Sequence, residues 1–349
     1  MFKTIKMLLD FSERKREETK ENPYVKNGMV LFTVGIGLIA GGYIFSLKLS
    51  IPSIQLYLNI DTSIGKLITI FGLVVTITGI AITLYGLYCE RNKWTEKIFY
   101  YLKGLDNQTS DPPFHALPKM AFLYHKNPIM LIVKNDNLDI MFDDFMLVKK
   151  NIEDKVEQFR SKDIFFAGLA RIPCLFFIGH SFRTAHSGSI TLIEHNHQND
   201  SWFRFDKTDD PDIDVIIEYD FSNVDESISD IAITIEFTSE IIKQELPCHL
   251  QKNIVRMKTS KEHTHNLIKS SIALERVVEK IINQLIILSK KCNILHLFVS
   301  AQSSLVFELG RRYQDGMIGN IIIYNYEPSK KGYPWAISLE NKEIKLEKY

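Results

Sequence analysis

Two short segments of this sequence carry side chains that can bind an anion. The first contains Gly168 and Arg171, and the second contains Ser300, Gln302, Ser303 and Ser304. In each segment an apolar run passes directly into a helical pattern, and the free N–H groups and dipole of a helix start favour phosphate. The segments also supply a guanidinium, hydroxyl groups and an amide as donors. For Ser303 and Ser304 the alternative is the ordinary N-cap role of serine.

Aromatic residues lie at the ends of the apolar runs that follow. The candidates for contact with a ligand are Trp202, Tyr324, Tyr326 and Trp335. Stacking of a base on an aromatic ring is worth ~1 to 3 kcal/mol and tolerates any base, so these rings are expected to recognise nucleobases. Phe203 and Tyr333, in the same runs, are interpreted as core residues.

Signals for a metal or for catalysis are weak. His195 and His197 form one histidine pair and His263 and His265 another, but neither has convincing carboxylate partners. The four cysteines lie far apart without a CxxC pair, so we predict no disulfide framework and no zinc site, and a reducing cytosol fits. HExxH, P-loop and GxSxG motifs are absent. We therefore predict no cofactor, no metal ligands and no catalytic residues.

The elements that position these side chains follow an α/β pattern. Short apolar runs at 164–170, 189–195, 214–220, 231–237, 294–300 and 320–326 predict strands. An amphipathic helix is expected over 143–160 and a long helix over 265–290. Ligands bind such open sheets at the carboxyl ends of the strands, which is where the two anion-binding segments fall.

The two segments belong to a repeated unit. Shifting the chain by 131 residues lays residues 163–195 over 294–326 without a gap, and pairs Phe176 with Phe307 and Gly179 with Gly310. It also pairs Gly188 with Gly319 and brings Trp202 beside Tyr333. Generic strand and helix patterning can produce part of this match, but the paired glycines favour a duplicated unit with a pseudo-twofold relationship.

Two long uncharged runs precede this α/β part. Residues 28–47 and 67–89 contain no charge, and each is long enough to cross ~30 Å of hydrocarbon. Lys and Arg number seven in residues 1–27, two in the loop between the runs and four in residues 89–105, so both termini are expected in the cytoplasm. A buried helix of a soluble protein is the alternative for either run.

Small residues occupy one face of the second run. Thr69, Gly72, Thr76, Gly79, Thr83 and Gly86 follow each other at steps of three and four. Such a face lets helices approach closely in a membrane. Either the two spans of one chain pack on each other there, or spans of neighbouring chains meet.

The predicted organisation is a cytosolic segment over residues 1–27, two spans with a short outer loop over 28–89, a linker over 90–118 and an α/β domain over 119–349. Lys and Arg balance Asp and Glu at 42 each, which argues against a protein that coats duplex nucleic acid.

The α/β part resembles the SAVED domain family. The segments AQSSLVFELGRR, IIIYNYE and YPWAISL between Leu297 and Leu339 carry the resemblance, together with FFAGLARIP and the strand of Trp202. The family consists of two fused CARF-like, Rossmann-like halves that sense cyclic oligonucleotides in CBASS antiphage systems and some CRISPR systems. Many members have a proline early in the second helix, where this chain has Gln302 and Ser303.

With two spans ahead of it, the whole chain resembles the transmembrane SAVED effectors of CBASS. The resemblance implies a non-enzymatic receptor in the bacterial inner membrane that binds a cyclic oligonucleotide made by a CD-NTase. The ligand would cause homo-oligomerisation, and the spans would then disrupt the lipid bilayer in abortive infection. One alternative is a membrane-tethered, metal-dependent hydrolase or nuclease that uses the histidine pairs. Another is an anchor whose toxic effector is a different protein.

Overall fold

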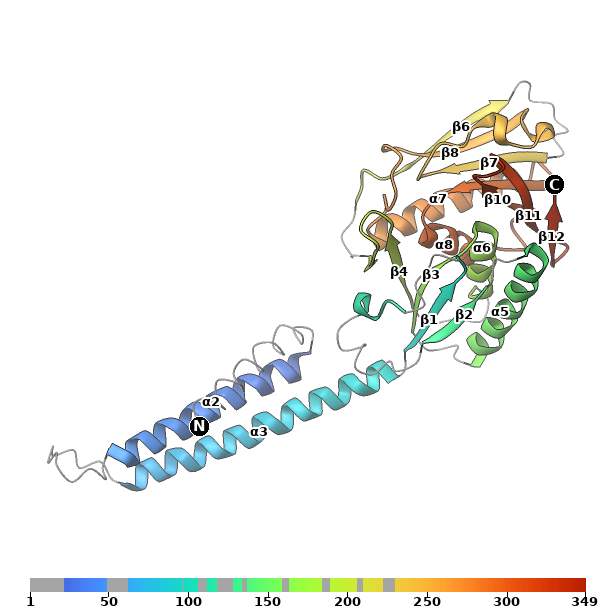
Figure 1. Ribbon diagram of the computed structural model, residues 1–349. Coiled ribbons are helices and arrows are strands. Elements are labelled where there is room, and N and C mark those ends of the chain that lie inside the picture. Colours follow the sequence, from blue (N-terminus) through green and yellow to red (C-terminus); the bar gives the residue numbers. More distant parts are fainter. Residues whose placement is uncertain are drawn as a thin grey trace. The chain divides into compact units, whose positions relative to one another are not determined.

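The computed structural model describes residues 22–48, 62–95, 97–105, 112–117, 128–133, 137–158, 163–183, 189–205, 210–221 and 230–349. They divide into two compact units, a helical pair up to residue 96 and an α/β unit from Lys97 onward (Figure 1). Each unit is described by itself. The N-terminal segment 1–21 and Gly188, which entered the sequence interpretation, lie outside the described residues.

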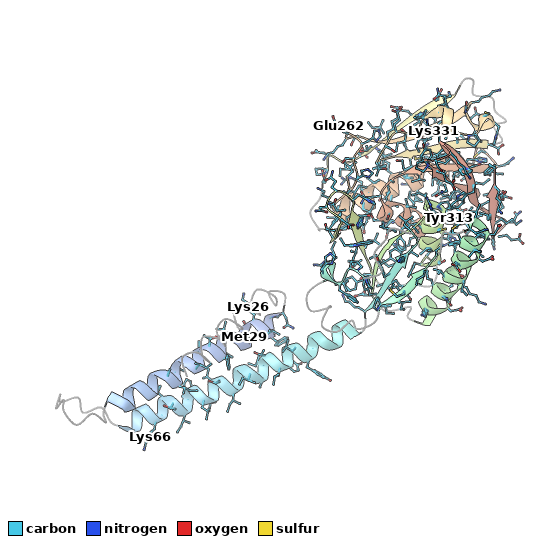
Figure 2. All side chains as sticks on the ribbon, viewed as in Figure 1. Lys26, Met29, Lys66, Glu262, Tyr313 and Lys331 are labelled. Carbon is cyan, nitrogen blue, oxygen red and sulfur yellow. The ribbon has the colours of Figure 1, made fainter. Side chains whose placement is uncertain are left out.

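The helical pair consists of α2 (Pro23–Lys48) and α3 (Thr62–Thr95). Stretches Pro23–Gly41 and Gly65–Cys89 have mean hydropathies of 1.4 and 2.4 and are long enough to cross a membrane. The two helices run in opposite directions, and Figure 2 shows Lys26 and Lys66, each near the start of its helix, toward opposite ends of the pair. Asn22 begins α2, where its Oδ1 accepts from the N–H of Tyr24 at 3.0 Å, and its Nδ2 donates to Gly86 O of α3 at 3.0 Å.

The small-residue face of α3 packs on α2 of the same chain. A Cβ added at Gly79 would lie 2.8 Å from Gly28 O, and one at Gly35 would lie 2.8 Å from Gly72 O. The hydroxyl of Thr76 donates back to Gly72 O at 2.7 Å, which satisfies this group within its own helix. In this structure the two spans of one chain pack on each other, which is one of the two alternatives for this face.

The first sheet of the α/β unit has five strands in the order β2-β1-β3-β4-β5. They are β1 (Ile98–Lys103), β2 (Ile129–Ile132), β3 (Ile164–Leu169), β4 (Ile190–Asn196) and β5 (Ser201–Arg204). All neighbours are parallel except β4 and β5. The central strand β3 is buried at all six positions, as expected for a parallel strand that is covered on both faces.

The second sheet has seven strands in the order β12-β11-β10-β9-β7-β8-β6. They are β6 (Val215–Phe221), β7 (Asp230–Glu236), β8 (Asn253–Thr259), β9 (Ile294–Ser300), β10 (Asn320–Glu327), β11 (Gly332–Glu340) and β12 (Glu343–Lys348). Strands β8, β7, β9 and β10 are parallel, and the other three are antiparallel to their neighbours.

Among the described residues, four α-helices accompany the sheets. They are α5 (Leu138–Gln158), α6 (Ile172–Ser181), α7 (Ser271–Ser289) and α8 (Ser303–Arg312). The inner faces of both sheets share one hydrophobic core with these helices. A second cluster covers the outer face of the second sheet beneath short 3-10 turns η2 (Lys243–Glu245) and η3 (Cys248–Leu250).

The predicted duplication is present in the structure. The order β1-β2-α5-β3-α6-β4-β5 is repeated as β7-β8-α7-β9-α8-β10-β11, with the same neighbours in each sheet. The 131-residue offset superposes α6 on α8 residue for residue, and it carries the pair Ile164–Ile190 onto the pair Leu295–Ile321. The two halves are therefore the paired α/β units that the sequence predicts.

The first half begins earlier than expected. Strand β1 lies within residues 90–118, which the sequence predicts as a linker, and it pairs with both β2 and β3. Strand β1 has only six residues and follows closely after the preceding helix, so the sequence pattern did not predict a strand there. The α/β unit accordingly starts at Lys97 and not at residue 119.

Candidate ligand-binding site

The two segments that the sequence predicts to bind an anion occupy equivalent strand-to-helix turns. Strand β3 ends at Leu169 before α6, and β9 ends at Ser300 before α8. The N–H of Gly104 donates to Leu169 O at 2.8 Å, and the N–H of Phe237 donates to Ser300 O at 2.8 Å. Each turn is thus supported in the same way by the segment that follows the neighbouring strand.

The start of α8 is occupied by a carboxylate of the protein itself. Glu194, at the end of β4, is 1% exposed, and its Oε2 accepts from the backbone N–H of Ser304 at 2.8 Å. Its Oε1 accepts from the N–H of His195 at 3.1 Å. Burial raises the pKa of the Glu194 carboxyl, although these hydrogen bonds oppose the shift. At this turn the anion that the helix start favours is therefore already present.

Gln302 connects the same region to the segment that precedes α7. Its Oε1 accepts from the N–H of Ile268 at 3.0 Å, and its Nε2 donates to the carbonyl oxygen of Ile268 at 3.0 Å. The Nε2 group also donates to Ser304 Oγ at 3.0 Å. Gln302 and Ser304 are 7% and 5% exposed. Both side chains are engaged in hydrogen bonds within the protein. Ser303, in contrast, is half-buried and makes no side-chain hydrogen bond to any described residue.

The start of α6 differs from that of α8 in the side chains that lie beside it. Arg171 precedes the helix at its N-cap position, where no side chain caps the backbone N–H groups. Its guanidinium is half-buried and makes no hydrogen bond or ion pair within the described part of the chain. Gly168 has a packing role, because an added Cβ would lie 2.5 Å from the Cβ of Leu102 on β1. Arg171 is therefore the cation available to a ligand at this edge.

The predicted aromatic residues separate into two groups. Trp202 and Tyr326 are half-buried at the carboxyl edges. Trp202 contacts His195 with ring centroids 5.0 Å apart, and Tyr326 contacts Tyr333 at 5.3 Å in the equivalent place of the second half. These two pairs confirm that Trp202 and Tyr333 occupy matching positions.

Tyr324 and Trp335 instead belong to the core and are 1% and 4% exposed. Tyr324 stacks on Phe298 at 4.3 Å on the outer face of the second sheet. Trp335 lies on the inner face and its Nε1 donates to Glu327 Oε1 at 3.1 Å. Neither presents a free ring face to a ligand in this structure, because strand pairing turns both rings toward other elements.

Sequence reasoning missed two buried acids at this edge. Glu194 is one, and Glu236 at the end of β7 is the other, fully buried, with Arg256 donating to its Oε1 at 2.7 Å. Its Oε2 is buried and has no hydrogen-bond partner among the described residues. A single acid at the end of an apolar strand run is the sequence signal that could have found each of them.

The rings of His195, His197 and His265 contact one another. Contrary to the expectation from the sequence, His195 also has a carboxylate partner, because its Nε2 lies 2.9 Å from Asp200 Oδ1. The ring of His195 lies 4.8 Å from that of His197, which lies 5.6 Å from that of His265. Burial lowers the pKa of His197, and the neighbouring histidines lower it further. In the part of the chain that the structure describes, no three His, Cys, Asp or Glu side chains are arranged to hold a metal ion.

Two cavities lie away from all ten predicted residues. One of about 360 Å³ is lined by Arg183, Glu279, Ile282, Asn283, Arg311, Arg312 and Gln314. The other, of about 250 Å³, shares Arg311 and includes Glu275 and Glu308 among its lining residues.

A known domain family matches the α/β part of the chain. The family model of the "SMODS-associated and fused to various effectors sensor domain", SAVED, matches residues 147–339, more than half of the chain. No curated protein matches the sequence.

The solved structures that match this chain include the SAVED/CARF-domain containing receptor Cap4 of Acinetobacter baumannii. In complex with the cyclic trinucleotide 2'3'3'-cAAA it has a TM-score of 0.46 and 15% identity, over 78% of this chain and 59% of that one. Its complex with 3'3'3'-cAAA has the same TM-score and coverage at 14% identity. The Cap4 receptor of Moraxella osloensis has a TM-score of 0.38 and 14% identity, over 82% of this chain and 59% of that one. This chain thus spans less than two thirds of the length of these proteins. From the family match, the chain belongs to the SAVED sensor-domain family.

Proposed function

We propose that this protein is a membrane-anchored receptor that binds a cyclic oligonucleotide, most specifically a cyclic trinucleotide, and acts as a CBASS effector. The observation that carries the proposal is the match of the SAVED sensor domain over residues 147–339, which include both strand-to-helix turns. Such a ligand carries several phosphates and bases, so it needs both anion-binding and stacking groups.

The start of α6 is where we expect a ligand phosphate. Its N–H groups have no side-chain cap, and Arg171 is free to contribute a charge-assisted hydrogen bond. The start of α8 is less suited, since Glu194 would have to leave first. Trp202 and Tyr326 are the aromatic residues that remain accessible for base stacking.

The membrane part of the proposal rests on α2 and α3. Both helices would span the inner membrane with the two termini in the cytoplasm, and a CD-NTase would supply the ligand. One chain with two spans cannot enclose a pore, so ligand-driven homo-oligomerisation would precede damage to the bilayer. Light scattering of the full chain in nanodiscs or detergent should show a mass that grows with ligand; a mass that stays monomeric at saturation would contradict this step.

Calorimetry tests the sensor. The full chain is titrated with cyclic di-, tri- and tetranucleotides, and micromolar or tighter binding of a trinucleotide is expected. Arg171→Glu should weaken binding by at least ~1.5 kcal/mol, because a charge-assisted contact is lost and a repulsive charge introduced. Lys150→Glu, on the exposed side of α5, provides the same change of charge as a control. Absence of binding to every compound would refute the proposed function, and equal affinity in the Arg171 variant would refute the site.

A further inference from the structure

Three arginines line the larger of the two cavities described above. Arg311 and Arg312 come from the end of α8, and Arg183 follows α6. The next residue after Arg312 is Tyr313, which is labelled in Figure 2. Asn283 and Gln314 add amide groups, and Glu279 is the single acid in the lining. The cavity lies at the end of α8 opposite to Ser303, about 13 Å away along the helix.

Two of these guanidiniums are held in place by the protein. Arg183 donates to Tyr313 O at 2.8 Å and to Asp315 Oδ2 at 2.9 Å. Arg311 donates to both carboxylate oxygens of Glu308, at 2.9 Å from Nε and 2.7 Å from Nη2. Their positions at the cavity are therefore fixed before any ligand arrives.

Arg312 is not satisfied in the same way. Its closest acidic atoms are Glu308 Oε2 at 3.7 Å and Glu275 Oε1 at 4.0 Å, both beyond hydrogen-bond distance. No described residue accepts a hydrogen bond from its guanidinium, and its side chain is 30% exposed. The N–H donors of its planar fork thus border the cavity without an acceptor among the residues that the structure describes.

We propose that this cavity binds a phosphorylated small molecule, with Arg312 as the main donor to the phosphoryl group. A guanidinium matches two phosphate oxygens at once. Arg183 and Arg311 are already hydrogen-bonded to the carboxylates of Asp315 and Glu308, so Arg312 is the arginine of the lining whose fork is open to a phosphoryl group. A volume of about 360 Å³ lies in the range of small-molecule sites. The smaller cavity shares Arg311 but contains neither Arg183 nor Arg312 in its lining.

Pyrophosphate is the probe for the test, titrated calorimetrically into the full chain at constant ionic strength. Arg312→Gln should weaken binding about tenfold, the loss expected for one charge-assisted hydrogen bond. Arg312→Lys, which keeps the charge but not the fork, should give an intermediate affinity. Lys150→Gln is the control for loss of one positive charge. Because Arg312 makes no hydrogen bond to a described residue, the melting temperature without probe should not change in either arginine variant. Equal pyrophosphate affinity in wild type and Arg312→Gln, or no binding to either, would overturn the proposal.

The same variants identify the source of the phosphoryl group. If the ligand is the cyclic oligonucleotide of the proposed function, Arg312→Gln weakens cyclic trinucleotide binding and pyrophosphate competes with it. If the source is a separate phosphorylated metabolite, cyclic trinucleotide affinity is unchanged while pyrophosphate affinity falls. A wild-type chain that binds pyrophosphate but no cyclic oligonucleotide would refute the proposed function and leave this site intact.

Discussion

Gly179 and Gly310 occupy equivalent positions in the two halves, and each contacts the backbone of the other's helix. A Cβ added at Gly179 would overlap Phe307 O and lie 3.2 Å from Arg311 N, and one at Gly310 would overlap Phe176 O and lie 3.1 Å from His180 N. The residues that repeat along the sequence are therefore the residues that touch across the pseudo-twofold. Only glycine lets α6 and α8 approach this closely.

Substitution at this crossing should weaken the α/β unit. Gly179→Ala or Gly310→Ala places a methyl group against backbone, which cannot move aside like a flexible side chain, and overpacking of this kind costs about 1–3 kcal/mol. The full chain should melt several degrees lower when followed by tryptophan fluorescence. Gly316→Ala is the control, since nothing lies within 4 Å of its added Cβ. Alanine variants at Gly179 and Gly310 that melt like the control would show that the helices separate without cost.

Removing the carboxylate of Glu194 should loosen the start of α8. Glu194→Ala leaves the buried N–H of Ser304 without its carboxylate acceptor, which costs about 1–3 kcal/mol. Hydrogen exchange at the Ser304 amide should become faster, while amides in the middle of α7 keep their protection. Unchanged exchange at Ser304 would mean that water or another group replaces the carboxylate.

His296 should make the fold sensitive to acid. Burial lowers the pKa of His296 from 6.5 to about 4, and its Nδ1 lies 3.0 Å from the Tyr324 hydroxyl. Because the unfolded chain binds a proton at this ring at a higher pH than the folded chain does, acid favours unfolding. The contribution of His296 to the free energy of unfolding is therefore complete above pH 6.5 and decreases by about 3 kcal/mol in total as the pH falls toward 4. Burial also lowers the pKa of His180, which adds in the same direction.

Chemical denaturation of the full chain at pH 7 and pH 4.5 measures this effect. His296→Gln keeps a hydrogen-bonding group without a titrating ring, and it should reduce the loss of stability between the two pH values. His263→Gln, at an exposed position, should leave the loss as it is in the wild type. An equal loss in the His296 variant would exclude this residue as the cause.

In the helical pair, two glycines should respond differently to the same substitution. Gly79→Leu would force a side chain into the backbone of Phe32 and Gly28, so α2 and α3 should separate and the chain should lose its thermal stability in detergent. Gly37→Leu adds the same volume where nothing lies within 4 Å, and it should be tolerated. Membrane damage in cells supplied with ligand then distinguishes packing within one chain from packing between chains. Gly37→Leu would lower the damage only if neighbouring chains meet at the face of α2 that carries Gly37. Equal stability of both variants would contradict the packing of the pair.

The sequence by itself determined the local elements. Six apolar runs predicted strands that the structure contains, and the helix from Ser303 to Arg312 follows its strand where the pattern places it. The uncharged runs at residues 28–47 and 67–89 predicted two long helices, since length and lack of charge are properties of a segment alone. The repeat could also be recognised, because both halves retain glycines that the same packing requires.

Only the tertiary structure decided which side chains remain available to a ligand. Glu194 and Ser304 are 110 residues apart, and no local pattern shows that one closes the helix start of the other. Tyr324 and Trp335 had the right type and position for stacking, but the pairing of β10 with β11 turns them to opposite faces, each into a core cluster. The three arginines of the cavity likewise come from two helix ends that meet only because α6 and α8 cross at Gly179 and Gly310. Contacts between distant segments depend on how whole elements pack, and a local sequence pattern does not specify which segments meet.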